Sequence, residues 1–298
     1  MKATLGWIAA LLCLAPGMAS AGPFGVIDKM RLERANEALD GELHDYTANN
    51  GEDRRIQSNA LGEKRDMYVY VPPGFRRDRA YPFIIYLHGL NQDEQSFLEV
   101  APLFDEGIRK GILPPCVIAA PDGTINGDPA LFGSGSFYIN SEAGRFEDWI
   151  MKDVWCFCFN RYPLRRERCC HGLVGASMGG FGVYNLAIKY RHDVSIVAGI
   201  LPALNLRYVN CHGNAQANYN PDCYGLLSSL RPGQPIACLG GILPIHRRAL
   251  VKPLFPIEPE TLEKLAKESP IEMLDRYGVQ PGELRMFIGY AGRDDFNL

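Results

Sequence analysis

A serine framed by glycines is the residue best placed to do chemistry in this sequence. Ser177 lies in the pattern Gly-x-Ser-x-Gly, Gly175-Ala176-Ser177-Met178-Gly179, between an apolar run and a helical spacing of apolar residues. Such glycines allow a strand to turn sharply into a helix, which exposes the serine hydroxyl at the top of a sheet. Ser177 is therefore a candidate nucleophile for attack on a carbonyl carbon. The alternative is a glycine-rich turn without chemistry.

A serine nucleophile also needs hydrogen-bond donors for the oxyanion that forms during attack. The backbone N–H of Met178 follows Ser177 directly and opens the predicted helix, whose dipole favours negative charge. A second donor is expected from the loop after the strand that ends at His88-Gly89, most simply the N–H of Leu90. We predict that Leu90 and Met178 form the oxyanion hole and that His88 shapes this loop.

The acid and the base of a triad are expected after the serine, in that order. Residues 286–290 form a predicted late strand, and Asp294 and Asp295 follow it; we choose Asp294 as the acid. All six histidines precede it: His44, His88, His171, His192, His212 and His246. We therefore expect that the sequence is a fragment whose missing C-terminal segment bears the catalytic histidine. The alternative is that His212 or His246 reaches the cleft by an unusual topology.

The apolar pattern along the chain predicts an α/β fold with a mainly parallel sheet. Continuous apolar runs, as buried parallel strands require, alternate with helical patterns. Predicted strands cover 81–90, 116–120, the apolar run at Leu173 and Val174 before Ser177, 194–200 and 286–290. Antiparallel edge strands are expected over 43–47 and 67–71, and helices over 28–37, 95–109, 146–159 and the residues after Ser177. A Gly- and Ser-rich loop over 124–144 is interpreted as a cleft wall.

The segment over about 203–258 interrupts this alternation, because it is rich in Pro, Gly and Cys and has no clear periodicity. We interpret it as an insertion over the carboxyl edge of the sheet, where ligands bind in open α/β folds. A surface loop tied by disulfides and without function is the alternative for most of its residues.

The N-terminus has the features of a secretory signal peptide over residues 1–21. Lys2 supplies the positive start, Trp7 to Leu14 form an apolar stretch too short for a membrane span, and Ala19-Ser20-Ala21 resembles a cleavage site. We therefore predict a secreted or periplasmic protein with a single domain over 22–298. A formal charge of −3 argues against a nucleic-acid or anionic-membrane partner.

Nine cysteines are present, and eight remain once Cys13 is removed with the signal peptide. An even number in an exported protein favours disulfides. We expect one bridge between the pair Cys156/Cys158 and the pair Cys169/Cys170, and another between Cys211 and Cys223. A metal site in the two pairs is the alternative, but their spacing matches no usual zinc motif.

These stretches together resemble the putative-esterase branch of the α/β-hydrolases, which includes S-formylglutathione hydrolases, feruloyl and acetyl-xylan esterases, and mycolyltransferases. The similar stretches are Tyr86-Leu87-His88-Gly89-Leu90, Gly133-Ser134-Gly135-Ser136-Phe137-Tyr138, Phe146-Glu147-Asp148, Gly175-Ala176-Ser177-Met178-Gly179-Gly180 and Gly292-Arg293-Asp294-Asp295-Phe296. The resemblance implies Ser177 as nucleophile, the Leu90 and Met178 amides as oxyanion hole, and Asp294 as acid.

The activity implied is that of an exported carboxylic-ester hydrolase, which forms an acyl-enzyme on Ser177 and needs no metal or organic cofactor. Its substrate would be a small-molecule or carbohydrate-linked ester. Without a histidine base, we expect the chain as given to be inactive or weak. Two alternatives stay open: an acyltransferase of the same fold, and a non-catalytic exported binding protein that has lost its triad.

Overall fold

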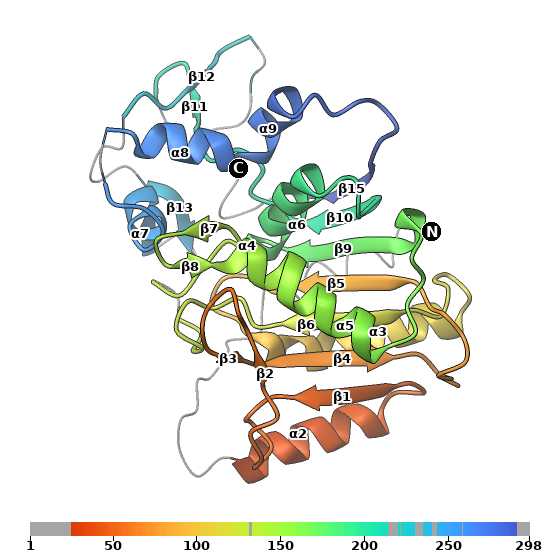
Figure 1. Ribbon diagram of the computed structural model, residues 1–298. Helices are drawn as coiled ribbons and strands as arrows, with labels where there is room; N and C mark the ends of the chain where they lie inside the picture. Colours follow the sequence, from red (N-terminus) through yellow and green to blue (C-terminus); the bar gives the residue numbers. More distant parts are fainter. Residues whose placement is uncertain are drawn as a thin grey trace.

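A seven-stranded sheet forms the centre of the computed structural model, which describes residues 25–130, 133–213, 220, 222–229, 235–239, 243–257 and 259–290. The strands lie side by side in the order β1 (Glu42–Tyr46), β4 (Met67–Val71), β6 (Val117–Pro121), β5 (Phe83–Leu87), β9 (His171–Ala176), β10 (Ile196–Ile200) and β15 (Arg285–Gly289) (Figure 1). The five strands from β6 to β15 are parallel, whereas β1 and β4 pair antiparallel. This arrangement confirms the predicted α/β class.

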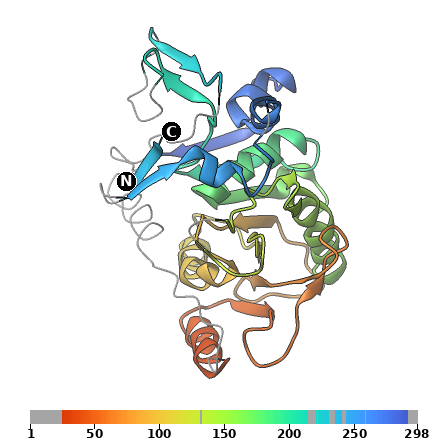
Figure 2. The same cartoon turned by 90° about the vertical axis from the view of Figure 1, so that its left-hand side faces the viewer.

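Helices cover both faces of the sheet, because alternate side chains of the central strands point to opposite sides. In β5, Phe83, Ile85 and Leu87 belong to one buried cluster, while Tyr86 belongs to another. Figures 1 and 2 show α3 and α5 on opposite faces. The helices before β10 are α2 (Gly25–Glu37), α3 (Phe97–Arg109), α4 (Phe146–Asp148), α5 (Trp155–Arg161) and α6 (Met178–Lys189).

The helix predicted over 146–159 is divided into α4, a π-helical segment over Trp149–Val154, and α5. Trp149 is fully buried in the π segment, and its indole N–H donates a hydrogen bond to the Asp122 carbonyl, 2.8 Å away. The segment is thus tied to the loop that follows β6. Single-turn π segments of this kind are frequent near functional sites.

The insertion contains two hairpins, which its sequence did not reveal. They pair β11 (Tyr208–Asn210) with β12 (Tyr224–Leu226) and β13 (Pro235–Leu239) with β14 (Leu243–His246), and they are followed by α7 (Arg247–Val251), α8 (Thr261–Glu268) and α9 (Pro270–Arg276). Short two-residue ladders join β2 (Ile56–Gln57) to β3 (Lys64–Arg65) and β7 (Asn140–Ser141) to β8 (Gly144–Arg145).

The helical part of the insertion packs over the carboxyl edge of the sheet, as expected. Buried Val251, Leu254 and Phe255 share a cluster with Ile139 and Phe181, which flank the Ser177 turn. In Figure 1, α7 and β13 lie at the end of the sheet toward which the β5 and β9 arrows point. The insertion therefore contributes to the surroundings of this edge.

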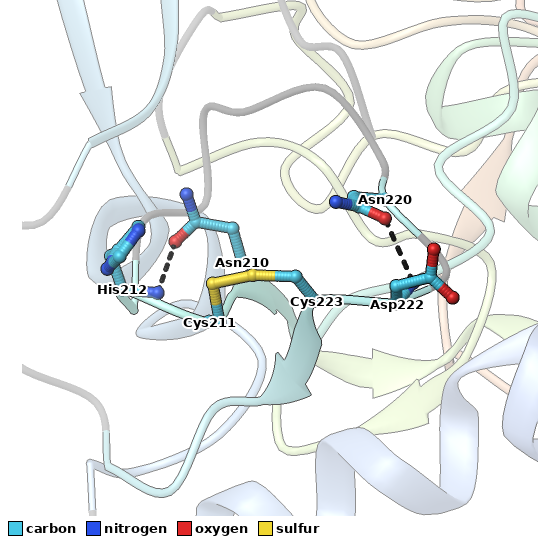
Figure 3. The surroundings of a disulfide bond; sticks show 6 residues. All are labelled: Asn210, Cys211, His212, Asn220, Asp222 and Cys223. Atoms are coloured by element: carbon cyan, nitrogen blue, oxygen red, sulfur yellow. Dashed lines mark hydrogen bonds between the residues drawn. A yellow bond between two sulfur atoms is a disulfide. The ribbon is translucent and has the colours of Figure 1, made fainter.

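The disulfide expected between Cys211 and Cys223 is present (Figure 3). The side chains of Asn210 and Asn220 accept hydrogen bonds of 2.9 Å from the backbone N–H groups of His212 and Asp222 beside it. These contacts lie at the loop end of the β11–β12 hairpin, where β11 ends and β12 begins.

The other expected bridge is wrong, because Cys156, Cys158, Cys169 and Cys170 are all free thiols. Cys158 is fully buried in the main core, whereas Cys169 is exposed in the turn before β9. Among the described residues, no helix is long and apolar enough to cross a bilayer.

The turn from β9 into α6 is packed backbone against backbone. A Cβ atom on Gly179 would lie 2.0 Å from the Leu87 carbonyl oxygen, and one on Gly175 would lie 2.5 Å from the Gly179 oxygen. Real Cβ atoms do not approach other atoms so closely, so both positions require glycine. The predicted elbow is thus held directly against the end of β5.

We expect Gly175→Ala to destabilise the protein by about 3 kcal/mol or more, because a methyl group there forces backbone strain and overpacking. Gly172→Ala is the matched control in the same strand, since its Cβ would meet ordinary contacts of 3.6 Å and beyond. Urea unfolding of both variants measures the difference. Equal stability of the two would contradict the packing argument.

Candidate active site

Ser177 lies in a strained backbone conformation between β9 and α6. Its φ of 52° and ψ of −115° are unusual for a residue other than glycine and cost roughly 1–3 kcal/mol. The Ser177 N–H donates to the Ile200 carbonyl at 2.8 Å, and the Ser177 carbonyl accepts from the Phe181 N–H at 2.9 Å. The backbone is thereby fixed on both sides. Within the described residues, no hydrogen bond occupies the Ser177 hydroxyl.

The side chains of Leu90 and Met178, the predicted oxyanion-hole residues, both lie close to Gly135 in the loop over 124–144. A Cβ atom on Gly135 would lie 2.6 Å from Leu90 Cδ1 and 3.0 Å from Met178 Sδ. The loop after β5 also approaches the elbow, because a Cβ on Gly89 would lie 3.6 Å from the Ala176 oxygen. The fold thus brings both residues beside Ser177, and the role of their N–H groups stays a prediction.

His88 is buried and uses both ring nitrogens within the loops at this edge. The Gly123 N–H donates to Nε2 at 2.8 Å, so Nδ1 carries the proton of a neutral ring and donates to the Gly89 carbonyl at 2.9 Å. His88 therefore joins the loop after β5 to the loop after β6. This geometry agrees with the interpretation that His88 shapes the loop.

The sequence did not indicate that Tyr138 contributes to the site. Its hydroxyl donates a 3.0 Å hydrogen bond to the His88 carbonyl, and its side chain is fully buried. Cβ atoms on Gly123 and Gly182 would lie 2.2 Å and 2.6 Å from the Tyr138 side chain, so two glycines make room for it. Tyr138 thereby connects the cleft-wall loop to the loop that carries Leu90.

Two adjacent residues of the cleft-wall loop have left-handed backbones, Phe137 with φ of 52° and Tyr138 with φ of 56°. Side chains of this size rarely adopt such a conformation, so tertiary packing must impose it. The only signal in the sequence was the position of Tyr138 in the Gly133–Tyr138 stretch. Neither the strain nor the hydrogen bond is readable from that pattern.

We expect Tyr138→Phe to lower the free energy of unfolding by about 1–3 kcal/mol, because the buried His88 carbonyl loses its donor. The matched control is Tyr277→Phe, since the partly exposed Tyr277 hydroxyl makes no hydrogen bond with the described residues. Urea unfolding compares the two variants. A Tyr138→Phe protein as stable as the control would show that this bond does not hold the loop.

Acidic side chains lie buried beside the same loops. Burial raises the pKa of Glu94 well above its usual range, and nearby Asp93 adds to the effect. The Glu94 side chain accepts a 2.7 Å hydrogen bond from the Asn49 amide. Burial also raises the pKa of Asp66 to about 6, against the opposing hydrogen bond from the Ala48 N–H. Both groups favour protonation in the folded state.

Because the pKa of Asp66 is higher in the folded protein than in the unfolded chain, a rise in pH lowers the stability of the folded protein. The stabilising contribution of Asp66 is complete below the unfolded pKa of 3.8 and is lost as pH rises through about 6, at a cost of about 2–3 kcal/mol. We expect Asp66→Asn to remove this loss between pH 4 and 7, as measured by urea unfolding. Exposed Asp275→Asn is the control. If the stability of Asp66→Asn fell with rising pH as steeply as that of the unchanged protein, Asp66 would not be the titrating group.

The remaining predicted site residues are not joined to Ser177 by the structure. Asp294 and its alternative Asp295 lie outside the described residues. His171 binds the Asp193 and Arg165 carbonyls through its two nitrogens, and no described histidine hydrogen-bonds to the Ser177 hydroxyl. The acid and the base therefore stay predictions. In the described part of the chain, no group of three or more His, Cys, Asp or Glu side chains could hold a metal ion.

Comparison with known proteins shows which protein family this chain matches. The profile of the family described as putative esterase matches residues 58–294. The S-formylglutathione hydrolase of Paracoccus denitrificans (strain Pd 1222) is 27% identical over 157 residues, which are 50% of this chain and 55% of that protein. The chain thus spans about half the length of this relative.

Two solved structures share the fold. A ferulic acid esterase matches with a TM-score of 0.53 and 15% identity over 86% of this chain and 92% of that one. The S-formylglutathione hydrolase of Staphylococcus aureus matches with a TM-score of 0.51 and 13% identity over 85% of this chain and 80% of that one. With the profile match over most of the sequence, this chain belongs to the putative esterase family of the α/β-hydrolases.

Proposed function

We propose that this chain carries the catalytic domain, over 22–298, of an exported serine carboxylic-ester hydrolase. The observation that carries the proposal is the strained Ser177 between β9 and the N-terminus of α6, with its hydroxyl free of hydrogen bonds among the described residues. A backbone conformation of this cost persists where function maintains it. Membership of the putative esterase family supports ester hydrolysis as that function.

In the proposed mechanism, Ser177 Oγ attacks the ester carbonyl carbon and gives its proton to a base. The N–H groups of Leu90 and Met178 stabilise the oxyanion of the tetrahedral intermediate. The intermediate collapses to an acyl-enzyme as the alcohol leaves with the proton from the base. Water then attacks the acyl-enzyme by the same steps in reverse, and the carboxylic acid is released.

Asp294 is proposed to orient a histidine that serves as this base and then as the acid. Among the described residues, no histidine is hydrogen-bonded to Ser177, so the base is not identified there. We therefore propose that the chain as given hydrolyses esters slowly, since a positioned general base contributes about 10²–10⁴ in rate. The scheme uses no metal or organic cofactor.

Export is proposed from the signal-like residues 1–21. The Cys211–Cys223 disulfide supports it, because such bonds persist in oxidising compartments. The proposed substrates are small-molecule or carbohydrate-linked esters that reach Ser177 beneath α7 and the cleft-wall loop. Packing of Val251 and Phe255 against Phe181 supports a cleft partly formed by the insertion.

We expect added imidazole to accelerate both the hydrolysis of p-nitrophenyl acetate and the labelling of Ser177 by a fluorophosphonate probe, each by roughly 10-fold or more, because imidazole replaces the base. Ser177→Ala should lose both effects, and its rate with imidazole corrects for the reaction in solution. Exposed Ser229→Ala is the matched control and should behave as the unchanged chain.

The outcomes separate the proposal from its rivals. Equal labelling of Ser177→Ala would exclude Ser177 as nucleophile. A folded chain that neither reacts with the probe nor responds to imidazole would favour the non-catalytic binding protein instead.

A further inference from the structure

A pair of neighbouring thiols lies on the surface, directly before the strand that ends at Ser177. Cys169 and Cys170 occupy a 3₁₀ turn over Arg168–Cys170, and β9 begins at the next residue. Their sulfur atoms lie 4.0 Å apart. Cys169 is exposed and Cys170 is partly exposed. Neither residue takes part in the proposed hydrolysis.

The backbone that carries this thiol pair is held firmly. The Arg168 guanidinium donates to the carbonyls of Arg191 and Glu283, two segments far away in sequence. The Cys170 N–H donates to the Glu167 carbonyl at 2.8 Å. The two sulfurs therefore extend from a fixed turn, and a ligand that bridges them has little loop entropy to overcome.

The positively charged side chain of Arg165 lies beside the thiol pair, and the Arg165 backbone is held by hydrogen bonds. Arg165 Nη1 is 3.8 Å from Cys170 Sγ, so it partly neutralises negative charge on a bound thiolate. The Arg165 carbonyl is in turn bound by His171 Nε2 at 2.8 Å, and the Arg165 N–H donates to the Tyr81 carbonyl at 2.8 Å. The guanidinium is thus carried by an anchored backbone.

We propose that Cys169 and Cys170 bind one thiophilic metal ion of low coordination number, with Cu(I) as its type. A single ion can bridge the two sulfurs, because two metal–thiolate bonds of about 2.3 Å, the length known for zinc, together exceed their 4.0 Å separation. Soft thiolate ligands select such ions. Each thiol releases its proton to solvent as its sulfur binds, and no electron is transferred.

Two other uses of the pair fit the geometry less well. Structural zinc takes four protein ligands, and the described residues offer no cluster of three or more candidate side chains. A disulfide prefers Cα atoms about 4.4–6.8 Å apart, whereas Cα atoms of adjacent residues are separated by about 3.8 Å. A shared ion avoids that strain, because it lets the sulfurs stay apart.

The test is an anaerobic titration of the full chain with Cu(I), with the Cys211–Cys223 disulfide intact and the other cysteines as thiols, in competition with bicinchoninate and followed by native mass spectrometry. Cys169→Ser and Cys170→Ser should each weaken binding of one Cu(I) by roughly 10²–10⁴-fold, because two-point attachment is lost. Cys156→Ser, which removes an exposed thiol on α5, is the matched control and should bind as the unchanged chain.

Phenylarsine oxide provides a second measurement that needs no metal. Its arsenic forms two As–S bonds with a thiol pair and releases one water molecule, so a single adduct should form and vanish in either variant of the pair. Equal Cu(I) affinity and equal arsenical capture in the Cys169→Ser and Cys170→Ser chains would overturn the proposal. The test is independent of ester hydrolysis, so its failure leaves the proposed function unaffected.

Discussion

The position of Ser177 depends on contact between two pieces of backbone. The start of α6 lies so close to the end of β5 that no side chain fits at Gly179, where a Cβ would be 2.0 Å from the Leu87 oxygen. Side chains adjust their rotamers to small changes, but peptide groups in a sheet do not. Ser177, the proposed nucleophile, therefore takes its place from the central strands themselves, and the strain at Ser177 is offset by the packing of the whole sheet.

A second level of support comes from buried polar groups between the loops. The His88 ring links the loops after β5 and β6, the Tyr138 hydroxyl binds the His88 carbonyl, and the Trp149 indole binds the Asp122 carbonyl. Each bond satisfies a backbone group that would otherwise be buried without a partner. Loops that would move freely in water are thus held at defined places around the cleft.

Much of this architecture is predictable from sequence, and the reason is periodicity. Apolar runs identified the parallel strands, alternation identified β1 and β4, and the glycines around Ser177 identified the elbow, because each pattern reflects a local geometric need. The pairing of Cys211 with Cys223 followed from their proximity in the chain. These features can be predicted without knowing which distant segments of the chain contact one another.

Features that depend on distant contacts were not predictable. The free thiols of Cys156 and Cys158, the hairpins of the insertion and the hydrogen bond of Tyr138 follow from tertiary packing. A pattern of residue types does not encode the left-handed backbone at Phe137 either, because the surrounding structure imposes it.

The insertion and the elbow are attached to the fold in different ways, and this has an evolutionary consequence. α7 and the residues after it are attached mainly by apolar side chains, with Leu254 and Phe255 in one cluster with Phe181 and Ile139 and a single backbone hydrogen bond from the Glu142 N–H to the Leu254 carbonyl. The elbow, in contrast, is packed backbone against backbone. Apolar side-chain contacts tolerate substitution when volume is conserved. The side chains of the insertion can therefore diversify by mutation while Ser177 keeps its geometry. If Ser177 is the nucleophile that we propose, new specificities are accessible without rebuilding the elbow.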